Sequence, residues 1–456
     1  MRRARPPPAL SACAPLVALA LCSSADARAN PLDVFGFGSR QTAMGGAVSA
    51  DVSDFSATYY NPAGLALARG LEVTVGYFRA DHFLYMNGKN SGVDPVKGTV
   101  GGAVVPGKVL GVPFAFGIGF HIPDNWITRV RALPQTEPRW EMYDNRNQSL
   151  WFGVDVAVSP LPWLQLGGGL TFMAATTATL DISGHIDLFT PTDSSLRHEV
   201  DADVTLIAYP AFGARVEATK DLAFSLVYRG QFKEQLIVNA NVLSGVGLGR
   251  AGDLTVLALG LQSDTVDAFL PQQVVLGGSW KATPDLHVNL EAEWVNWGAY
   301  IPPVAQITTQ LNVPAPAGGW PLGIQAPTTP PATIVLPIVI HDTVVPRVGV
   351  EWRAVARPRW EGFVRGGYEY AKSPIADQSG PTNYVDRDRH TMSAGVGLRL
   401  IHPGRVLPGD VRFDAHGQLS VLPTGTTIKT DASDPIGSYT AGGHIWNVGL
   451  TATVGF

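Results

Sequence analysis

The last thirteen residues of the chain, His444–Phe456, alternate strictly between two kinds of side chain. The even positions carry His444 and then only apolar residues, whereas the odd positions after Ile445 carry asparagine, threonine or glycine. Because successive side chains of a β-strand point to opposite faces, this segment predicts a strand with one apolar and one polar face. An apolar outer face and a polar inner face are typical of strands in an outer-membrane barrel.

Similar alternation occurs in earlier segments, for example Leu286–Trp294, Thr391–Leu400 and Val411–Val421. Six short links and seven long links separate the alternating segments, so they join fourteen strands. Short turns at one rim and long loops at the other are the arrangement of bacterial barrels, so we expect an all-β fold, a transmembrane antiparallel β-barrel of about 14 strands. The short links are expected at Lys108–Val112, Ser159–Trp163, Thr219–Asp221, Ala282–Asp285, Ala354–Arg359 and His402–Gly409, and the long links at Asp81–Lys97, Pro123–Gln148, Ile182–Glu199, Phe232–Asp267, Gln310–Ala332, Lys372–Asp388 and Leu422–Ala441.

The composition agrees with a membrane barrel. Only 16% of the 456 residues are charged, whereas soluble domains average about 25%. The body of the chain has no uninterrupted apolar run of about 20 residues, which argues against helical membrane spans. A soluble β-sandwich is the alternative fold, but the aromatic last residue, Phe456, resembles the signal by which bacterial outer-membrane proteins are recognised for assembly. The net charge of -5, without a Lys/Arg stripe, gives no indication of nucleic-acid binding.

Residues 1–29 have the three parts of a secretory signal peptide. Three arginines lie within the first five residues, an apolar stretch lies near residues 16–21, and Ala27-Arg28-Ala29 is a small-x-small cleavage site. Cleavage there would also remove Cys13 and Cys22, so the mature chain would have neither disulfides nor thiol chemistry. We therefore expect an exported protein of the Gram-negative outer membrane.

Residues 30–69 do not alternate cleanly and are rich in glycine, alanine and serine. They nevertheless contain too many apolar side chains for a solvated tail. We expect this segment to be a hatch that plugs the lumen of the barrel, with Gly45 and Gly46 permitting close packing and Pro62 ending the segment. The domain boundaries expected are thus 1–29 for the signal peptide, 30–69 for the hatch and 70–456 for the barrel.

The hatch segment resembles the N-terminal hatch of the FadL family, outer-membrane transporters of long-chain fatty acids and aromatic hydrocarbons. The Asn-Pro-Ala motif of that family stands here as Asn61-Pro62-Ala63. Later stretches are also similar to the family, namely Leu270–Trp297, His341–Trp352, Tyr368–Gln378 and Asp386–His390.

The resemblance implies a barrel whose periplasmic side is closed by the hatch. A hydrophobic ligand would dock among the external loops and enter an apolar pocket. Movement of the hatch would release the ligand, which would leave sideways through a gap made by a kinked strand. This scheme couples no energy source and needs no cofactor or metal.

The resemblance also suggests candidate site residues. Asn61, Pro62 and Ala63 would lie next to the lateral opening, or form a simple turn. Asp342 and Arg389 would form a charge pair inside the wall, either functional or a wet salt bridge of little energetic value. Residues that would contact the ligand, act as a latch or simply pack the plug are Leu32, Val34, Phe35 and Phe37. Arginines of inward parity that could bind a carboxylate are Arg215, Arg229, Arg347, Arg365 and Arg399.

We therefore expect a passive channel for hydrophobic compounds such as fatty acids or hydrocarbons, embedded as a monomer in outer-membrane lipid. A general diffusion porin for small hydrophilic solutes is the first alternative, although a porin would not need an apolar plug. An outer-membrane lipid hydrolase is the second. A hydrolase needs an activated serine near a histidine, and the chain has no G-x-S-x-G, so we expect no enzymatic activity.

Overall fold

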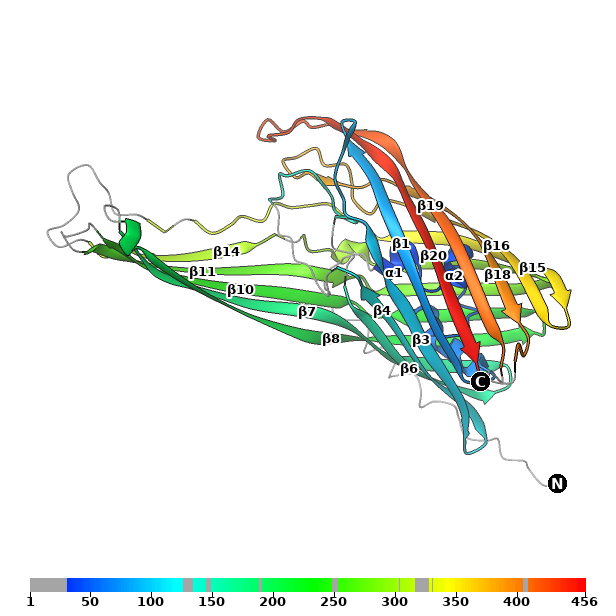
Figure 1. Ribbon diagram of the computed structural model, residues 1–456. Coiled ribbons are helices and arrows are strands. Elements are labelled where there is room, and N and C mark those ends of the chain that lie inside the picture. Colours follow the sequence, from blue (N-terminus) through cyan, green and yellow to red (C-terminus); the bar gives the residue numbers. More distant parts are fainter. Residues whose placement is uncertain are drawn as a thin grey trace, which may run out of the picture.

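Fourteen strands of the computed structural model close into one antiparallel ring (Figure 1). The structure describes residues 31–125, 134–144, 149–187, 191–247, 253–302, 304–315, 328–329, 331–404 and 409–456, so the expected signal peptide lies outside the described residues. The last strand pairs with the first, from Gly455 opposite Glu72 to Ala441 opposite Met86. The predicted barrel of about 14 strands is therefore confirmed.

The strands follow one another around the ring in chain order, each paired with the next. They are β1 (Glu72–Met86), β3 (Val96–Val109), β4 (Val112–Pro123), β6 (Trp151–Leu161), β7 (Leu164–Asp187), β8 (Ser195–Thr219), β9 (Leu222–Arg229), β12 (Gln273–Thr283), β13 (Leu286–Val295), β15 (Thr343–Arg357), β16 (Trp360–Ala371), β18 (Arg389–Leu400), β19 (Val411–Thr427) and β20 (Tyr439–Gly455). Three two-residue strands lie in the connections: β2 (Lys89–Asn90), β5 (Arg139–Trp140) and β17 (Tyr384–Val385).

The two faces of the wall are those that the alternation predicts. On β20 the side chains of Trp446 and Leu450 are 48% and 60% exposed, whereas those of Asn447 and Thr451 are buried towards the lumen. The C-terminus lies at the rim of short turns (Figure 1). Separately, the helices among the described residues are all too short or too polar to cross a membrane.

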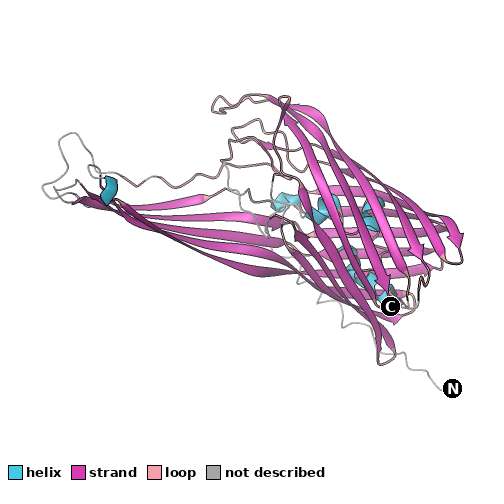
Figure 2. Ribbon diagram, in the orientation of Figure 1, coloured by secondary structure: helices cyan, strands magenta, loops and turns pink. Residues whose placement is uncertain are grey.

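The segment before β1 is folded inside the ring (Figure 2). It contains three short α-helices, α1 (Pro31–Phe35), α2 (Ser39–Ala43) and α3 (Ala57–Tyr60), followed by the 3-10 helix η1 (Pro62–Leu67). Helices this short cannot form alone, because helix nucleation is costly and only tertiary packing repays it. We call residues 31–67 the hatch.

One part of the loop assignment is wrong. Phe232–Asp267, expected as an external loop, forms two long strands, β10 (Phe232–Gly247) and β11 (Asp253–Leu270). The expected loop at Ile182–Glu199 is also largely strand, because β7 continues to Asp187 and β8 begins at Ser195. These strands project far beyond the ring together with β14 (Gln306–Asn312), at the left of Figure 1. The alternating apolar residues of these segments face one another on paired strands. The loop assignment is wrong because it leaves out that the segments can pair with one another.

Candidate functional site

The hatch fills the lumen with a cluster of aromatic side chains. The ring of Phe37 lies 4.8 Å from that of Phe55 and 5.0 Å from that of Trp151 on β6, measured between centroids. Tyr59 and Tyr60 meet edge to face, and the hydroxyl of Tyr60 accepts a hydrogen bond of 3.1 Å from the backbone nitrogen of Phe37. Phe37 has no exposed surface. In this conformation the aromatic cluster therefore obstructs the lumen, as a hatch would.

The Asn61-Pro62-Ala63 motif lies directly against the wall. The side chain of Asn61 accepts a hydrogen bond from the nitrogen of Ala63 (3.0 Å) and donates one to the carbonyl of Ser49 (2.7 Å). It thereby caps η1 and ties that helix to the preceding loop. The motif is thus the fixed start of η1.

Two glycines of the wall make this close approach possible. A Cβ at Gly213 on β8 would lie 2.0 Å from the Asn61 amide oxygen, and one at Gly167 on β7 would lie 2.4 Å from the backbone nitrogen of Ala63. These two glycines are directly paired across the ladder. The side of the wall that contacts the hatch in this way, which we call the glycine side, has further such positions at Gly102, Gly117, Gly119 and Gly153.

Within the described residues, β4 shows no lateral gap of the kind made by a kinked strand. β4 is paired with β3 from Val112 to Pro123, and with β6 from Phe114 to His121. Sideways release at this place would need a change in the wall or the hatch.

The same region holds an unusual group, because both carboxylate oxygens of buried Asp155 on β6 have no hydrogen-bond partner among the described residues.

The opposite side of the wall also contacts the hatch through glycines, at Gly349, Gly367 and Gly395. It adds ion pairs to these contacts, and we call it the charge side. Arg40 on α2 bonds to Glu351 on β15 through Nε at 2.9 Å and through Nη2 at 3.0 Å, and to Asp51 of the hatch at 2.6 Å. Arg365 and Asp414 of the wall extend this cluster. Burial alone would lower the pKa of Arg40, but the two carboxylates raise the pKa above its usual value, so the guanidinium stays charged.

A second chain of ion pairs runs along the charge side towards the outer rim. Arg229 pairs with Glu293, which Arg347 also contacts at 2.5 Å. Arg347 continues to Glu369 at 2.7 Å, and Glu369 binds Arg389 at 2.6 Å. The arginines expected as carboxylate-binding candidates at positions 229 and 347 are therefore already held by wall carboxylates. The same is true of Arg365 and Arg399, while Arg215 donates to the carbonyl of Ala50 and to Gln165.

A small cavity lies on the outer side of the hatch. Its volume is about 70 Å³, and its lining includes Val34 of α1, Trp297 and Val345. Ligand pockets usually measure about 300–1,000 Å³, so α1 would have to shift before a long ligand fits. Of the four predicted ligand or latch residues, Val34 borders this cavity, while the others, Leu32, Phe35 and Phe37, are packed in the core cluster. Their role as latch stays a prediction.

Asp33 was not expected from the sequence, yet it anchors α1 at this cavity. Its carboxylate accepts hydrogen bonds from the hydroxyl of Tyr59 and from Nε2 of Gln273 on β12, the second at 3.1 Å. Asp33 stands between two apolar residues, and its partners are distant in sequence, so no local pattern identifies it. Arg40 and Gln273 escaped the sequence analysis for the same reason.

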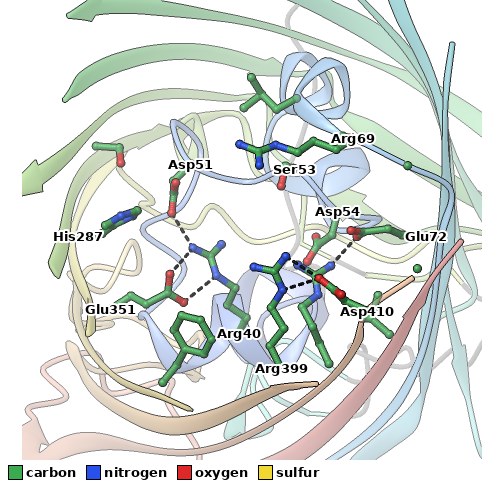
Figure 3. A pocket seen from close by; sticks show the side chains of 18 of the residues that line it. Arg40, Asp51, Ser53, Asp54, Arg69, Glu72, His287, Glu351, Arg399 and Asp410 are labelled. Atoms are coloured by element: carbon green, nitrogen blue, oxygen red, sulfur yellow. Dashed lines mark hydrogen bonds and ion pairs between the residues drawn. The ribbon is translucent and has the colours of Figure 1, made fainter. Parts of the chain in front are cut away.

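A second cavity of about 740 Å³ lies between the hatch and the rim of short turns, which faces the periplasm in bacterial barrels. Figure 3 shows charged side chains around it, among them Arg69, Glu72, Arg399 and Asp410. Asp51, His287 and Glu351 offer atoms within 4.8 Å of one another, as metal ligands do. However, the guanidinium of Arg40 already bonds to both carboxylates, so the absence of a metal stays the expectation.

Asp342 and Arg389 have different partners among the described residues. Asp342 accepts a hydrogen bond of 2.7 Å from the backbone nitrogen of Gly298, whereas Arg389 binds Glu369. No contact between the two is described, and a functional charge pair stays a prediction.

Comparisons with known proteins support the architecture. The chain is 23% identical over 424 residues to alkane uptake protein A of Marinobacter nauticus, covering 87% of this chain and 85% of that protein. The structure superposes on that of a Pseudomonas aeruginosa FadL homologue with a TM-score of 0.56 at 15% identity, covering 92% of this chain and 98% of the other. The toluene transporter TodX of Pseudomonas putida gives 0.53 at 13% identity, with 92% and 98% covered. At such identities these structures show the fold alone.

The family model of the outer membrane protein transport proteins, described as OMPP1/FadL/TodX, matches residues 18–403. This is most of the chain, including the hatch and twelve of the fourteen ring strands, β1 to β18. The chain therefore belongs to the OMPP1/FadL/TodX family of outer-membrane transport proteins.

Proposed function

We propose that this protein is a passive outer-membrane channel for hydrophobic compounds, and that neutral hydrocarbons are its preferred class. The observation that carries the proposal is the contrast across the hatch. On the outer side, Val34, Trp297 and Val345 line a cavity next to charged side chains such as Arg347 and Glu293, which pair with each other or with other wall residues. The periplasmic cavity, by contrast, has charged and polar side chains such as Arg69 and Glu72 at its centre in Figure 3. The named relative that takes up alkanes supports the same class.

The pairing of two arginines supports neutral hydrocarbons over fatty acids, although Lys372 also borders the cavity and has no ion pair among the described residues. Arg347 and Arg389 border the outer cavity, and both are bound to wall carboxylates. A fatty-acid carboxylate would have to displace Glu369 or Glu293 from these pairs, and it would add a negative charge beside them. A hydrocarbon makes no such demand. Long-chain fatty acids remain the alternative ligand.

We further propose that the ligand leaves sideways into the bilayer. A hydrocarbon gains about 0.8 kcal/mol for each buried CH₂, so passage through the charged periplasmic cavity would be opposed. The glycine side is the place where the Asn61-Pro62-Ala63 motif contacts the wall, at Gly167 and Gly213, which have no side chains between the motif and the wall backbone. Release would then require η1 to move away from this wall.

We also propose that the signal peptide is removed. N-terminal sequencing of the mature protein should then give Asn30 as the first residue.

The decisive experiment is uptake by cells with and without the protein. Labelled hexadecane, palmitate, toluene and a small sugar should be compared in a deletion strain and after complementation. We expect the largest restored rate for hexadecane. Restoration of the sugar alone would favour a porin, and palmitate above hexadecane would overturn the assignment to neutral hydrocarbons. Lipid hydrolysis by the purified barrel would contradict the expectation that it is no enzyme.

The exit route has its own test. Replacing Pro62 with alanine, or deleting residues 61–63, should lower hydrocarbon uptake while the barrel remains folded in the outer membrane. The matched control is Pro113→Ala at the start of β4, beside a short turn and away from the hatch motif. Unchanged uptake in correctly folded Pro62 variants would reject the lateral route without rejecting the channel itself.

A further inference from the structure

Five strands continue past the ring as a single-layer sheet, which we call the arm. Their order is β8, β7, β10, β11 and β14, with β7 and β10 parallel and the other neighbours antiparallel. β6 begins opposite Met173 of β7, and β9 ends opposite Ala211 of β8. Residues of β7 beyond this level have therefore left the wall. At about 3.3 Å per residue, the stretch to Asp187 extends roughly 45 Å past the ring (Figure 1).

The arm has one apolar and one polar face. Leu180 of β7 is paired with Val200 of β8, and Val242 of β10 with Leu259 of β11, so these side chains share faces across the ladder. Val242 is also in register with Ile182. On the opposite face β8 carries Glu199, Asp201 and Asp203, with Asp181 of β7 opposite Glu199. Leu243 is an apolar exception on that face.

The apolar face of the arm is continuous with the lipid-facing wall. Leu166 and Leu170 of β7 and Phe212 of β8 are exposed on the outside of the ring. The same parity along the same strands leads to Leu180 and to Val200. The polar face continues the lumen, where Gln165 and Thr171 are buried. The arm therefore extends the lipid-facing surface past the level at which its ring neighbours β6 and β9 stop.

An exposed apolar sheet of this size needs a cover. Val200 and Val204 are 61% and 57% exposed, and Leu196 is 72% exposed. Five strands spaced about 4.8 Å apart and some nine residues long present a face of roughly 700 Å². A stable protein interface buries about 800 Å² on each partner. The face is thus close to the size that one protein partner covers.

We propose that the apolar face of the arm packs against the same face of a second copy of this chain. A second copy stands in the same membrane with the same orientation, so it presents an identical apolar face at the same height. Most homodimers use one surface twice around a two-fold axis, and two apolar sheet faces pack as the layers of a β-sandwich. The acidic faces then point away from each other, into water. The inference is an alternative to the monomer expected from the sequence, and it does not rest on the proposed function.

Single cysteines provide the test, because both natural cysteines lie within residues 1–29. Val200→Cys and Val204→Cys place a thiol on the apolar face, while Asp201→Cys and Asp203→Cys place one on the opposite face of the same strand. In intact outer membranes with a short bifunctional maleimide, we expect at least one apolar-face variant to cross-link to twice the mass of one chain. The two control variants should not cross-link and should keep the mass of one chain. Native mass spectrometry of the unmodified barrel should show the same doubled mass.

A second variant guards against indirect effects. Val200→Asp with Val204→Asp alters only the arm, so the ring should keep its heat-resistant fold while the doubled mass is lost. A single mass throughout, with the apolar-face cysteines freely labelled by aqueous maleimide, would overturn the proposal. A single mass with these cysteines protected in membranes but labelled in detergent would also overturn it, in favour of a lipid or hydrocarbon cover.

Discussion

Both sides of the wall approach the hatch through glycines, but only the charge side adds ion pairs to the hatch. On the glycine side, η1 and its Asn61 cap approach the wall so closely that Gly167 and Gly213 have no room for a side chain. On the charge side, Arg40 of α2 reaches Glu351 through paired hydrogen bonds. Close packing depends on shape and is lost when atoms are added. Ion pairing depends on partners and is lost when one partner is removed.

The difference indicates which part of the hatch can move. Contacts with glycine backbone are numerous but individually weak, because each van der Waals contact contributes only about 0.1–0.2 kcal/mol. Removing one member of a buried ion pair costs about 3–5 kcal/mol. We therefore expect η1 to separate from its wall more readily than α2 does, with Arg40 and Glu351 as the fixed point.

The largest effect is expected from Arg40→Met, which leaves Glu351 and Asp51 without their shared partner. Since these side chains are only partly exposed, the free energy of unfolding should fall by about 3 kcal/mol. Thermal unfolding in detergent and hydrogen exchange of residues 31–60 would measure the change. Arg399→Met is the control, because its ion pairs are 43% exposed on the arginine side and should contribute under about 1 kcal/mol. Equal effects would show that the charge side is not the anchor.

On the glycine side, Gly213→Ala should cost about 2 kcal/mol, because the new methyl group overlaps the Asn61 amide. Hydrogen exchange should then accelerate in residues 57–67 and not around Arg40. Gly417→Ala on β19 is the matched control, since a Cβ there would meet no described atom within 4 Å. If Gly213→Ala loosened α2 as much as η1, the two sides would not be independent.

The external loop above the charge side should respond to pH. Burial raises the pKa of Asp386 to about 6, although a hydrogen bond from Ser373 opposes the shift. Because the folded loop holds this proton more tightly than the unfolded loop, its stability is highest in acid and falls as the pH rises through about 6. Between pH 5 and pH 7 the opening of residues 372–388 should increase about tenfold. Limited proteolysis at both pH values would measure it, and Asp386→Asn should abolish the difference.

The smallest effect on stability is expected from Asp155→Asn, which should stabilise the fold. Asp155 lies on the glycine side without a hydrogen-bond partner among the described residues, and burying an unpaired carboxylate is costly. Asp155→Asn should therefore raise the free energy of unfolding by about 1 kcal/mol. Asp414→Asn on the charge side should lower it, since Asp414 binds Arg365 at 2.7 Å. Destabilisation by both substitutions would mean that Asp155 has a partner that the contacts do not reveal.

The wall was largely predictable from sequence, because its physics is local. The parity of Trp446 and Asn447 identifies the two faces of β20 without knowledge of its neighbours, and turn residues such as Pro284 and Asp285 mark where a strand reverses. The arm was not predicted, because its strand pairing is not local. Val238 and Val242 do alternate with polar residues, but the parallel pairing of β10 with β7 involves strands that are distant in the chain.

The site was less predictable because its contacts join distant positions. Arg40 and Glu351 are 311 residues apart, and nothing near either residue indicates the other. The Asn61-Pro62-Ala63 motif could be found, since a family resemblance carries it. The contact of this motif with Gly167 and Gly213 could not be predicted, because the sequence around a strand glycine does not show which residue will pack against it.

The close fit between the hatch and the glycine side also affects how permeable the outer membrane is. If the hatch left the lumen completely, the open bore would admit bile salts and large antibiotics as well as hydrophobic compounds. Transport must then proceed by small displacements that never empty the bore. Cells carrying variants with a loosened η1 should accordingly become sensitive to vancomycin.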